Sequence, residues 1–259
     1  MRAEAVLTAM PFQLIVLIPV YDHEAAIGAL VQRVLALALP CLLVDDGSHA
    51  ACACALDRLA QSPGVHLLRL PQNRGKGGAV MAGLREAARL GATHALQIDA
   101  DGQHDPGDIP AFVADARHAP NAVICGRSDY DASVPKARLY GRYLTHVWVW
   151  INTLSLQLRD TMCGFRVYPL ASALVVLEQE KLGSRMDFDT EILVRLCWRG
   201  VRMIQRKTRV TYPKDGVSHF HVWRDNWRIS VMHARLFLGM LRRAPRLLAQ
   251  RLRADRNGA

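Results

Sequence analysis

Two carboxylates stand two positions apart near the middle of the chain, at Asp99 and Asp101. They directly follow an apolar run, residues 95–98, which is typical of a buried strand. Side chains that follow a strand lie at the carboxyl edge of an open α/β sheet, where such sheets bind their ligands. Carboxylate oxygens suit Mg²⁺ or Mn²⁺, which usually keep coordination positions for substrate phosphates. The same pair is also typical of a polar turn before a helix, so it needs support from the rest of the chain.

Four other apolar runs are followed by polar segments, and these supply that support. The segments are residues 19–24, 45–48, 73–78 and 126–129. Each segment alone is typical of a solvated turn, but parallel strands would bring all of them to the edge that holds Asp99 and Asp101. Residues 75–78 read Gly-Lys-Gly-Gly, which lacks the spacing of a nucleotide-triphosphate P-loop and of a Rossmann dinucleotide loop. The glycines allow close backbone approach to a phosphate at a helix start, and Lys76 can meet a diphosphate as a point charge.

The hydrophobic pattern predicts the elements that position these segments. Continuous apolar runs predict strands over residues 14–18, 41–44, 65–70, 94–98 and 122–125. Helical periodicity between them predicts helices over residues 25–37, 51–59, 78–90 and 109–117. This alternation favours an α/β fold with a mostly parallel sheet and helices on both faces. Beyond residue 130 we expect helices over 135–158, 171–179 and 187–199, strands over 165–168 and 201–210, and a helical segment from residue 224. One domain over 1–222 would then carry a C-terminal appendage over 223–259.

Composition narrows the class of partner. The 259 residues are 51% hydrophobic, which allows a substantial core, and the formal net charge of +10 favours an anionic partner. That partner could be a nucleic acid, an anionic membrane or a phosphorylated substrate. The six cysteines form no Cys-x-x-Cys pair, which favours reduced thiols over zinc or a disulfide framework. A signal-peptide layout and an apolar run long enough to span a bilayer are both lacking, so we expect a cytoplasmic protein.

The basic residues gather in the C-terminal segment, where arginines alternate with leucine, methionine and tryptophan over residues 223–253. Such a pattern is typical of a helix that lies in the interface of a membrane. A helix that packs on the core with a solvated basic face is the alternative. A nucleic-acid partner is not expected, because no recognition module is apparent. Five residues of the preceding helical stretch are expected to extend the membrane surface: Arg138, Tyr140, Arg142, Trp148 and Trp150.

Read in order, the motifs resemble the family 2 glycosyltransferases, and most closely their dolichyl- and polyprenyl-phosphate sugar synthase branch. The resemblance covers about residues 13–220. Its motifs are P-x-Y at 19–21, V-D-D-G-S at 44–48, N-x-G-K-G at 73–77, D-A-D-G-Q-H at 99–104, G-x-R near 126–127, D-x-x-C-G-F-R at 160–166, F-[ED]-x-E-[IL]-L at 188–193 and G-x-S at 216–218. The sequence departs from the family pattern at two places. Residues 21–24 read Tyr-Asp-His-Glu, where the family often has Tyr-Asn-Glu-Glu. Pro213 occupies a position where the phosphate-sugar synthases often have an arginine.

The resemblance implies a GT-A fold that binds a nucleotide sugar, linked to UDP or GDP, together with Mg²⁺ or Mn²⁺. It implies metal ligands at Asp99, Asp101 and Gln103, and a role for Arg127 beside a phosphate. It also implies a set of donor-binding residues: Pro19, Tyr21, Asp22, Glu24, Asp45, Asp46, Lys76, Asp99 and Ala100.

The implied activity is the inverting transfer of a hexosyl or N-acetylhexosaminyl group to a lipid-linked acceptor at the inner face of the cell membrane, in lipid glycosylation of the cell envelope. Asp101 and Arg127 would stabilise the leaving diphosphate, and an alcohol acceptor would need a general base, for which Asp189 and Glu191 are the candidates. The alternative for this acidic pair is support of a helix N-terminus. Residues 218–220 and 224–226 resemble transferases of aryl-polyene lipid pathways, so an acceptor other than polyprenyl phosphate stays open. A sugar nucleotidyltransferase and a non-catalytic membrane-binding scaffold remain the rival functions.

Overall fold

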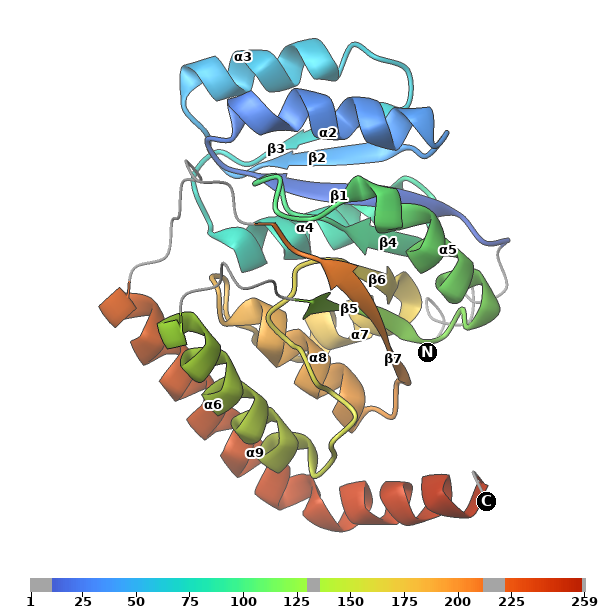
Figure 1. Cartoon of the computed structure of the whole chain (residues 1–259), viewed down its shortest axis with the longest axis vertical. Coiled ribbons are helices and arrows are strands. Elements are labelled where there is room, and N and C mark those ends of the chain that lie inside the picture. The colour runs from blue at the N-terminus through green and yellow to red at the C-terminus, as the bar shows by residue number, and fades with distance from the viewer. Residues whose placement is uncertain (1–10, 130–135, 212–221, 258–259) are drawn as a thin grey trace.

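A single sheet organises the part of the chain that the structure describes, which comprises residues 11–129, 136–211 and 222–257 of the computed structural model (Figure 1). Its strand order is β3-β2-β1-β4-β6-β5-β7. The strands are β1 (Leu14–Val20), β2 (Cys41–Asp45), β3 (Val65–Arg69), β4 (His94–Gln97), β5 (Val123–Asp129), β6 (Arg166–Pro169) and β7 (Met203–Arg209). The predicted α/β class and mostly parallel sheet are confirmed.

Strand β6 is the exception to the parallel arrangement. It pairs antiparallel with both β4 and β5, whereas the β1–β2, β1–β4, β2–β3 and β5–β7 pairs are parallel. Since β4 and β5 both oppose β6, they run in the same direction as each other. The carboxyl ends of β1, β2, β4 and β5 therefore meet at one edge of the sheet, as the polar segments predict.

Helices cover both faces of the sheet. They are α2 (Glu24–Ala36), α3 (Ala50–Leu59), α4 (Lys76–Arg89), α5 (Ile109–His118), α6 (Lys136–Thr153), α7 (Leu170–Gln179), α8 (Phe188–Trp198) and α9 (Val222–Asn257), with a 3₁₀ turn at Pro106–Asp108. One face packs against α2, α3 and α5, and the other against α4, α7 and α8. Alternate strand residues enter the two cores: Val16 and Ile18 face one, and Ile15 and Leu17 face the other.

Helix α6 is shorter than the sequence predicts. The expected helix over residues 135–158 ends at Thr153, because Leu154 adopts a left-handed conformation with φ of +49°. The Thr153 hydroxyl donates to the carbonyls of Val149 and Ser155 at this end. Apolar residues continue beyond Thr153, so the hydrophobic pattern alone does not reveal where the helix stops.

Helix α9 lies against α6 and α8 along the lower side of the molecule (Figure 1). Met232, Leu236 and Met240 recur every four residues and are buried, so they form the stripe that joins the core. Pro245 interrupts the hydrogen-bond ladder, and the helix changes direction in this region. Within the described ranges, no helix combines the length and the apolar character needed to cross a bilayer.

Candidate active site

Lys76 and Asp99 form the centre of the carboxyl edge. Lys76 opens α4, and its ammonium lies 2.7 Å from Asp99 Oδ2 and 2.9 Å from Asp189 Oδ2. Burial lowers the pKa of Lys76, but the attraction of Asp189 and Asp99 outweighs it and raises that pKa above its ordinary value. Burial likewise raises the pKa of Asp99, and the Lys76 charge reverses this to a net lowering. Both groups are therefore charged at neutral pH, although both are largely buried.

These contacts belong to a closed circuit of side chains. Arg166 Nη1 donates to the Asp189 carbonyl at 2.7 Å and to Tyr168 Oη at 3.0 Å. Tyr168 Oη donates to Gln97 Oε1 and Gln97 Nε2 donates to Asp99 Oδ1, each at 3.4 Å. We call the six residues the buried polar ring: Asp99, Lys76, Asp189, Arg166, Tyr168 and Gln97. Its two carboxylates are balanced by its two cations.

Asp101 is the acid beside the ring that is left without an ion pair among the described residues. Its Oδ1 accepts the backbone N–H of Gln103 at 3.0 Å. Burial, and then the negative charge of Asp99, raise the pKa of Asp101 above the ordinary value of an aspartate. Asp101 is therefore a half-buried acid whose carboxylate no ion pair in the described part of the chain neutralises.

His104 completes this segment, and no local pattern in the sequence predicts a role for it. Its ring lies 5.5 Å from that of Phe165, and burial lowers its pKa, so it is neutral at neutral pH. Its buried Nδ1 has no hydrogen-bond partner within the described part of the chain. Gly164 also packs against Asp99, and a Cβ atom added at Gly164 would collide with the Asp99 carboxylate. A glycine at this position leaves the space that the Asp99 carboxylate occupies.

The glycine segment is held from two sides. Asp46 accepts the backbone N–H groups of Arg74 at 2.7 Å and Gly75 at 2.8 Å. Burial raises the pKa of Asp46, and these two hydrogen bonds oppose the rise. On the other side the Gly78 N–H donates to the Ser184 carbonyl at 2.8 Å. Gly75 has φ of +83°, which favours glycine, and this turn delivers Lys76 to the ring.

Asp45 and Asp22 connect neighbouring loops at the same edge. Asp45 is buried and accepts from the Ser48 N–H and from Arg69 Nε, at 2.9 and 2.8 Å. Asp22 accepts the His49 N–H at 2.8 Å, while its own N–H donates to the Ser48 hydroxyl. These carboxylates fix the loops where the resemblance expects a nucleotide, and their predicted contacts with it stay predictions.

Asp189 and Glu191 occupy opposite sides of α8, because residues two apart on a helix differ by about 200° in direction. Asp189 points to Lys76, and its buried Oδ1 makes no hydrogen bond within the described part of the chain. Glu191 is fully buried and bonds Arg195, Arg235 and the Gly183 N–H. The structure therefore brings Asp189, and not Glu191, to the edge that holds Asp99.

One arginine differs from expectation. Arg142 was predicted to extend the outer surface, but its side chain is turned inward and pairs with Asp160 at 2.9 Å. Arg166 joins the ring through Asp189. Asp160 also accepts the N–H groups of Ser128, Met162 and Cys163, which fixes the loop before β6.

The remaining predicted residues lie at this edge without tested roles. Arg127 is half-buried on β5, with no ion pair among the described residues, and the Gln103 carbonyl accepts the Thr211 N–H. Glu24 opens α2, with a carboxylate 3.6 Å from His49 Nε2. Others lie on or just after strands: Pro19, Tyr21 and Ala100. Residues 212–221, which include Pro213 and the G-x-S motif, lie outside the described residues.

The donor set fits a hard divalent cation. No cluster of three or more His, Cys, Asp or Glu side chains suited to a metal occurs among the described residues. Mg²⁺ needs no such cluster, because it is usually held by one or two carboxylates together with waters and substrate phosphates. Asp101 is a half-buried oxygen donor without an ion pair among the described residues, and Asp99 lies beside it. These two residues would hold the ion.

The comparisons with known proteins agree with this geometry. The family model described as Glycosyl transferase family 2 matches residues 15–173. The chain belongs to this family. It is a glycosyltransferase, and the family match argues against the rival function of a sugar nucleotidyltransferase. The chain is 28% identical to the undecaprenyl-phosphate mannosyltransferase of Micrococcus luteus, over 74% of this chain and 81% of that protein. It is 27% identical to the dolichyl-phosphate β-glucosyltransferase of Dictyostelium discoideum, over 69% of this chain and 60% of that protein.

A solved structure supports the fold of the transferase. The glucosyl-3-phosphoglycerate synthase of Mycobacterium tuberculosis, in complex with Mn²⁺, UDP and phosphoglyceric acid, matches it with a TM-score of 0.65. The match covers 92% of the transferase and 80% of the other chain at 14% sequence identity. The predicted GT-A fold is confirmed by this likeness.

Proposed function

We propose that the transferase moves a sugar from a nucleoside-diphosphate donor, linked to UDP or GDP, to a lipid-linked acceptor at a membrane surface. The observation that carries the donor site is the uncompensated carboxylate of Asp101 beside Asp99 and Lys76 at the carboxyl edge. A divalent cation would supply the positive charge that Asp101 lacks, and its diphosphate would share the Lys76 ammonium with Asp99 and Asp189.

The chemistry follows from the charge that develops as the glycosidic bond breaks. The electron pair of the bond between the anomeric carbon and the diphosphate oxygen passes to the diphosphate. The acceptor oxygen attacks the opposite face of that carbon, so a single displacement inverts its configuration. Lys76 and Arg127 place positive charge where the leaving group becomes more negative. A bound Mg²⁺ or Mn²⁺ would act there as a Lewis acid.

An alcohol acceptor must lose a proton as it attacks, and Asp189 is the better-placed base. Asp189 faces Lys76 at the carboxyl edge, where its two oxygens lie 2.9 Å from Lys76 and 3.5 Å from Arg166. Glu191 lies on the opposite side of α8, where its carboxylate is bonded to Arg195 and Arg235. A phosphate acceptor is already ionised and needs no base. The rate of an Asp189 variant with each acceptor class would therefore separate the two.

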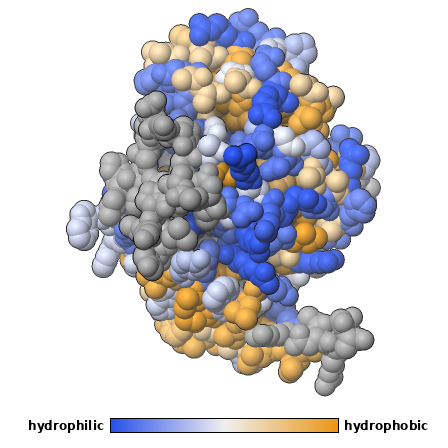
Figure 2. Space-filling view, in the orientation of Figure 1, coloured by the Kyte–Doolittle hydropathy of each residue, from blue (hydrophilic) through white to orange (hydrophobic). Residues whose placement is uncertain are grey.

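The membrane part of the proposal is supported by the outer surface of α6 and α9. Figure 2 shows apolar residues gathered along the lower side of the molecule, where Figure 1 draws these helices. We call this surface the α6–α9 apolar face. Its exposed residues are Tyr143, Leu144, Val147, Trp148, Ile151, Trp223, Trp227, Val231, Leu238, Leu241, Leu248 and Leu252. Arginines on α9 accompany them, which is the combination that favours an anionic membrane interface.

A cavity of about 350 Å³ supports an acceptor site next to the donor site. It lies between α9 and the segment over residues 182–187, which also contacts the glycine segment through Ser184. Trp227 and Val231 give it an apolar side, and Arg185 and Arg228 give it a basic side. A lipid with an anionic head group matches this combination, and we propose that its acceptor end enters here from the inner leaflet of the cell membrane.

Calorimetry with UDP, GDP, CDP and dTDP, with and without Mn²⁺, tests the donor site first. Metal-dependent binding of one nucleotide by the wild type, and its loss in Asp101→Ala, is the expected result. A second assay measures transfer to polyprenyl phosphate and to a lipid alcohol. Absence of nucleotide binding by the folded wild-type protein would contradict the proposal and favour the membrane-binding scaffold.

A further inference from the structure

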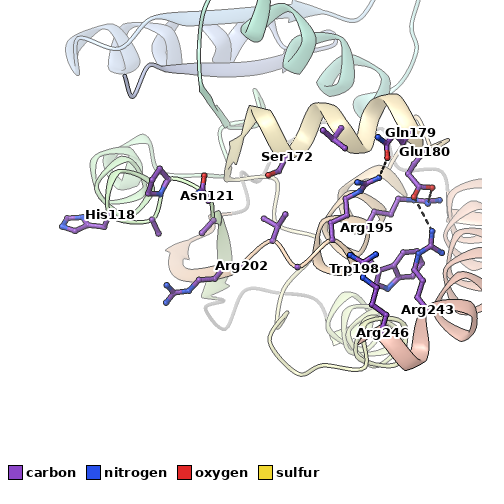
Figure 3. A pocket seen from close by; sticks show the side chains of 17 residues that line it. His118, Asn121, Ser172, Gln179, Glu180, Arg195, Trp198, Arg202, Arg243 and Arg246 are labelled. Carbon is purple, nitrogen blue, oxygen red and sulfur yellow. Dashed lines mark hydrogen bonds and ion pairs between the residues drawn. The ribbon is translucent and has the colours of Figure 1, made fainter. Parts of the chain in front are cut away.

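A second, larger cavity opens at the amino edge of the sheet, away from the donor site. Its volume is about 900 Å³, and it lies where β5 and β7 begin and where α5, α7 and α8 end. Helix α9 closes one side (Figure 3). Five arginines line it: Arg195, Arg199, Arg202, Arg243 and Arg246. Glu180 is the carboxylate among the lining residues.

The inner wall of this cavity is electrically matched. Arg195 lies 2.6 Å from Glu180 Oε2 and 2.7 Å from Glu191 Oε1. Arg243 lies 3.6 Å from Glu180 Oε1 and stacks over the Trp198 ring at 4.7 Å from its centroid. Figure 3 shows these side chains together on one side of the cavity. These ion pairs fix the wall in place, and they leave Arg195 and Arg243 already neutralised by Glu180 and Glu191.

Helix C-termini explain why some of the other basic residues lie at this cavity. The C-terminus of a helix carries about half a negative charge, and three helices end at this cavity. His118 ends α5, and Arg199 directly follows the last residue of α8. Arg199 also donates to the Gln179 side chain at 2.6 Å. The Arg199 guanidinium offsets the dipole of α8 and stabilises the fold without any ligand.

Arg202 and Arg246 are not explained in this way. Arg202 precedes β7, and Arg246 lies inside α9, eleven residues before its end at Asn257, so neither ends a helix at the cavity. Both are exposed, and neither has an ion pair among the described residues. Figure 3 shows Arg202 on the side of the cavity that carries His118 and Asn121, and Arg246 on the side that carries Trp198. A ligand that satisfies both must carry negative charge and extend across the cavity.

We propose that this cavity binds a phosphate-bearing anion, separately from the donor site. Guanidinium groups recognise phosphate oxygens by paired hydrogen bonds, and the cavity has the size of a small-molecule site. Ser172 and Asn121 add polar side chains to the lining. The phosphate comes from a lipid head group or from a free phosphorylated metabolite. The same turns of α9 expose Leu241 and Leu248, so the cavity rim is close to the α6–α9 apolar face.

The test compares Arg202→Gln/Arg246→Gln with the matched control Arg58→Gln/Arg242→Gln. Both variants remove two exposed arginines, one of them from α9, but the control residues lie outside the cavity. Vesicles of phosphatidylcholine with and without phosphatidylglycerol probe the lipid source, and glycerol 3-phosphate in EDTA probes the soluble source. We expect the cavity variant to lose roughly tenfold in affinity for one probe, and the control to lose much less.

Each outcome decides the source or overturns the site. A selective loss for phosphatidylglycerol vesicles identifies a lipid head group, and a selective loss for glycerol 3-phosphate identifies a free ligand. Equal losses in the two variants would mean that only overall charge matters, and no loss in either would mean that the cavity binds neither; both overturn the proposal. Asp101→Ala should bind like the wild type, because the cavity does not depend on the transfer reaction.

Discussion

The two edges of the sheet differ in the charges that their ion pairs leave unmatched. At the carboxyl edge the charges of the buried polar ring cancel, and one acid and one cation, the half-buried Asp101 and Arg127, remain without an ion pair among the described residues. At the amino edge the inner wall is matched, and Arg202 and Arg246 remain as cations without a carboxylate. In both places a closed set of ion pairs fixes the frame and leaves the unmatched charge available. The comparison indicates that a binding site is recognised by the charge that its frame does not neutralise.

The balance at the carboxyl edge is broken most severely by Lys76→Met. This change leaves Asp99 and Asp189 as neighbouring buried carboxylates without their shared cation. The free energy of unfolding should fall by about 3–5 kcal/mol, measured by urea denaturation at neutral pH. Lys207→Met is the control, because Lys207 is exposed and lies 3.6 Å from the exposed Asp129. A cost below about 1 kcal/mol for Lys76→Met would show that the ring is not a stabilising unit.

Removing Asp101, in contrast, should lower the transfer rate without lowering the stability of the fold. Asp101→Ala should lower the transfer rate by about 10² to 10³-fold, because the leaving diphosphate loses the charge stabilisation that this carboxylate organises. The melting temperature should not fall, because burial and the charge of Asp99 already disfavour ionised Asp101. Asp105→Asn, an exposed change in the same loop, is the control. A full transfer rate in Asp101→Ala would exclude the donor site described here.

The two acids of α8 compare a carboxylate that faces the donor edge with one that faces away from it. With an alcohol acceptor, Asp189→Asn should lower kcat by about 10²-fold or more, because the base is lost. Glu191→Gln should leave kcat unchanged but lower the free energy of unfolding by about 1–3 kcal/mol, because Arg195 and Arg235 lose a charged partner. Steady-state kinetics and urea denaturation on both variants separate the effects. The reverse pattern would assign catalysis to Glu191.

The smallest predicted effect is a change in the pH dependence of stability, and it arises where α6 contacts α9. Helix α9 lines both cavities. At its contact with α6, His233 lies against Asn152 and Trp148, and burial lowers the pKa of His233 to about 4. The unfolded chain binds a proton near pH 6.5, and the folded chain does not until about pH 4. Stability should therefore fall as pH decreases through this interval, by about 2 kcal/mol between about pH 7.5 and pH 5.

His233→Gln isolates this contribution from those of the other buried histidines. Thermal unfolding across this pH range should show a shallower pH dependence in the variant than in the wild type. Equal slopes would mean that His233 is solvated or already protonated in the folded protein.

The strands and the polar loops could be predicted from the sequence because they depend on local patterns. Continuous apolar runs give the strands, and parallel strands bring their carboxyl ends to one edge. The direction of β6 could not be predicted, because nothing in the sequence of a four-residue strand marks which way it runs in the sheet. Asp99, Asp101 and Lys76 were identified correctly as neighbours at that edge. Their roles in donor binding stay predictions.

Long-range pairings were beyond the sequence. The contact of Lys76 with Asp189 joins residues 113 positions apart, and no local pattern encodes it. The helical period separates Asp189 from Glu191, but only the packing of α8 shows which of them faces Lys76. Arg142 was assigned wrongly for the same reason, because only the fold shows that it pairs with Asp160.

The buried polar ring constrains how this chain can diverge. Each member contacts two others, so replacing one leaves a buried group without its partner, and the cost of a second replacement depends on the first. Asp99, Lys76, Asp189 and Arg166 therefore behave as one epistatic unit. An exchange of the charges at Lys76 and Asp99 would have to occur together with a change at Asp189, and single intermediates would be selected against. Drift in this protein should be rapid on the outer helices and nearly absent around the ring.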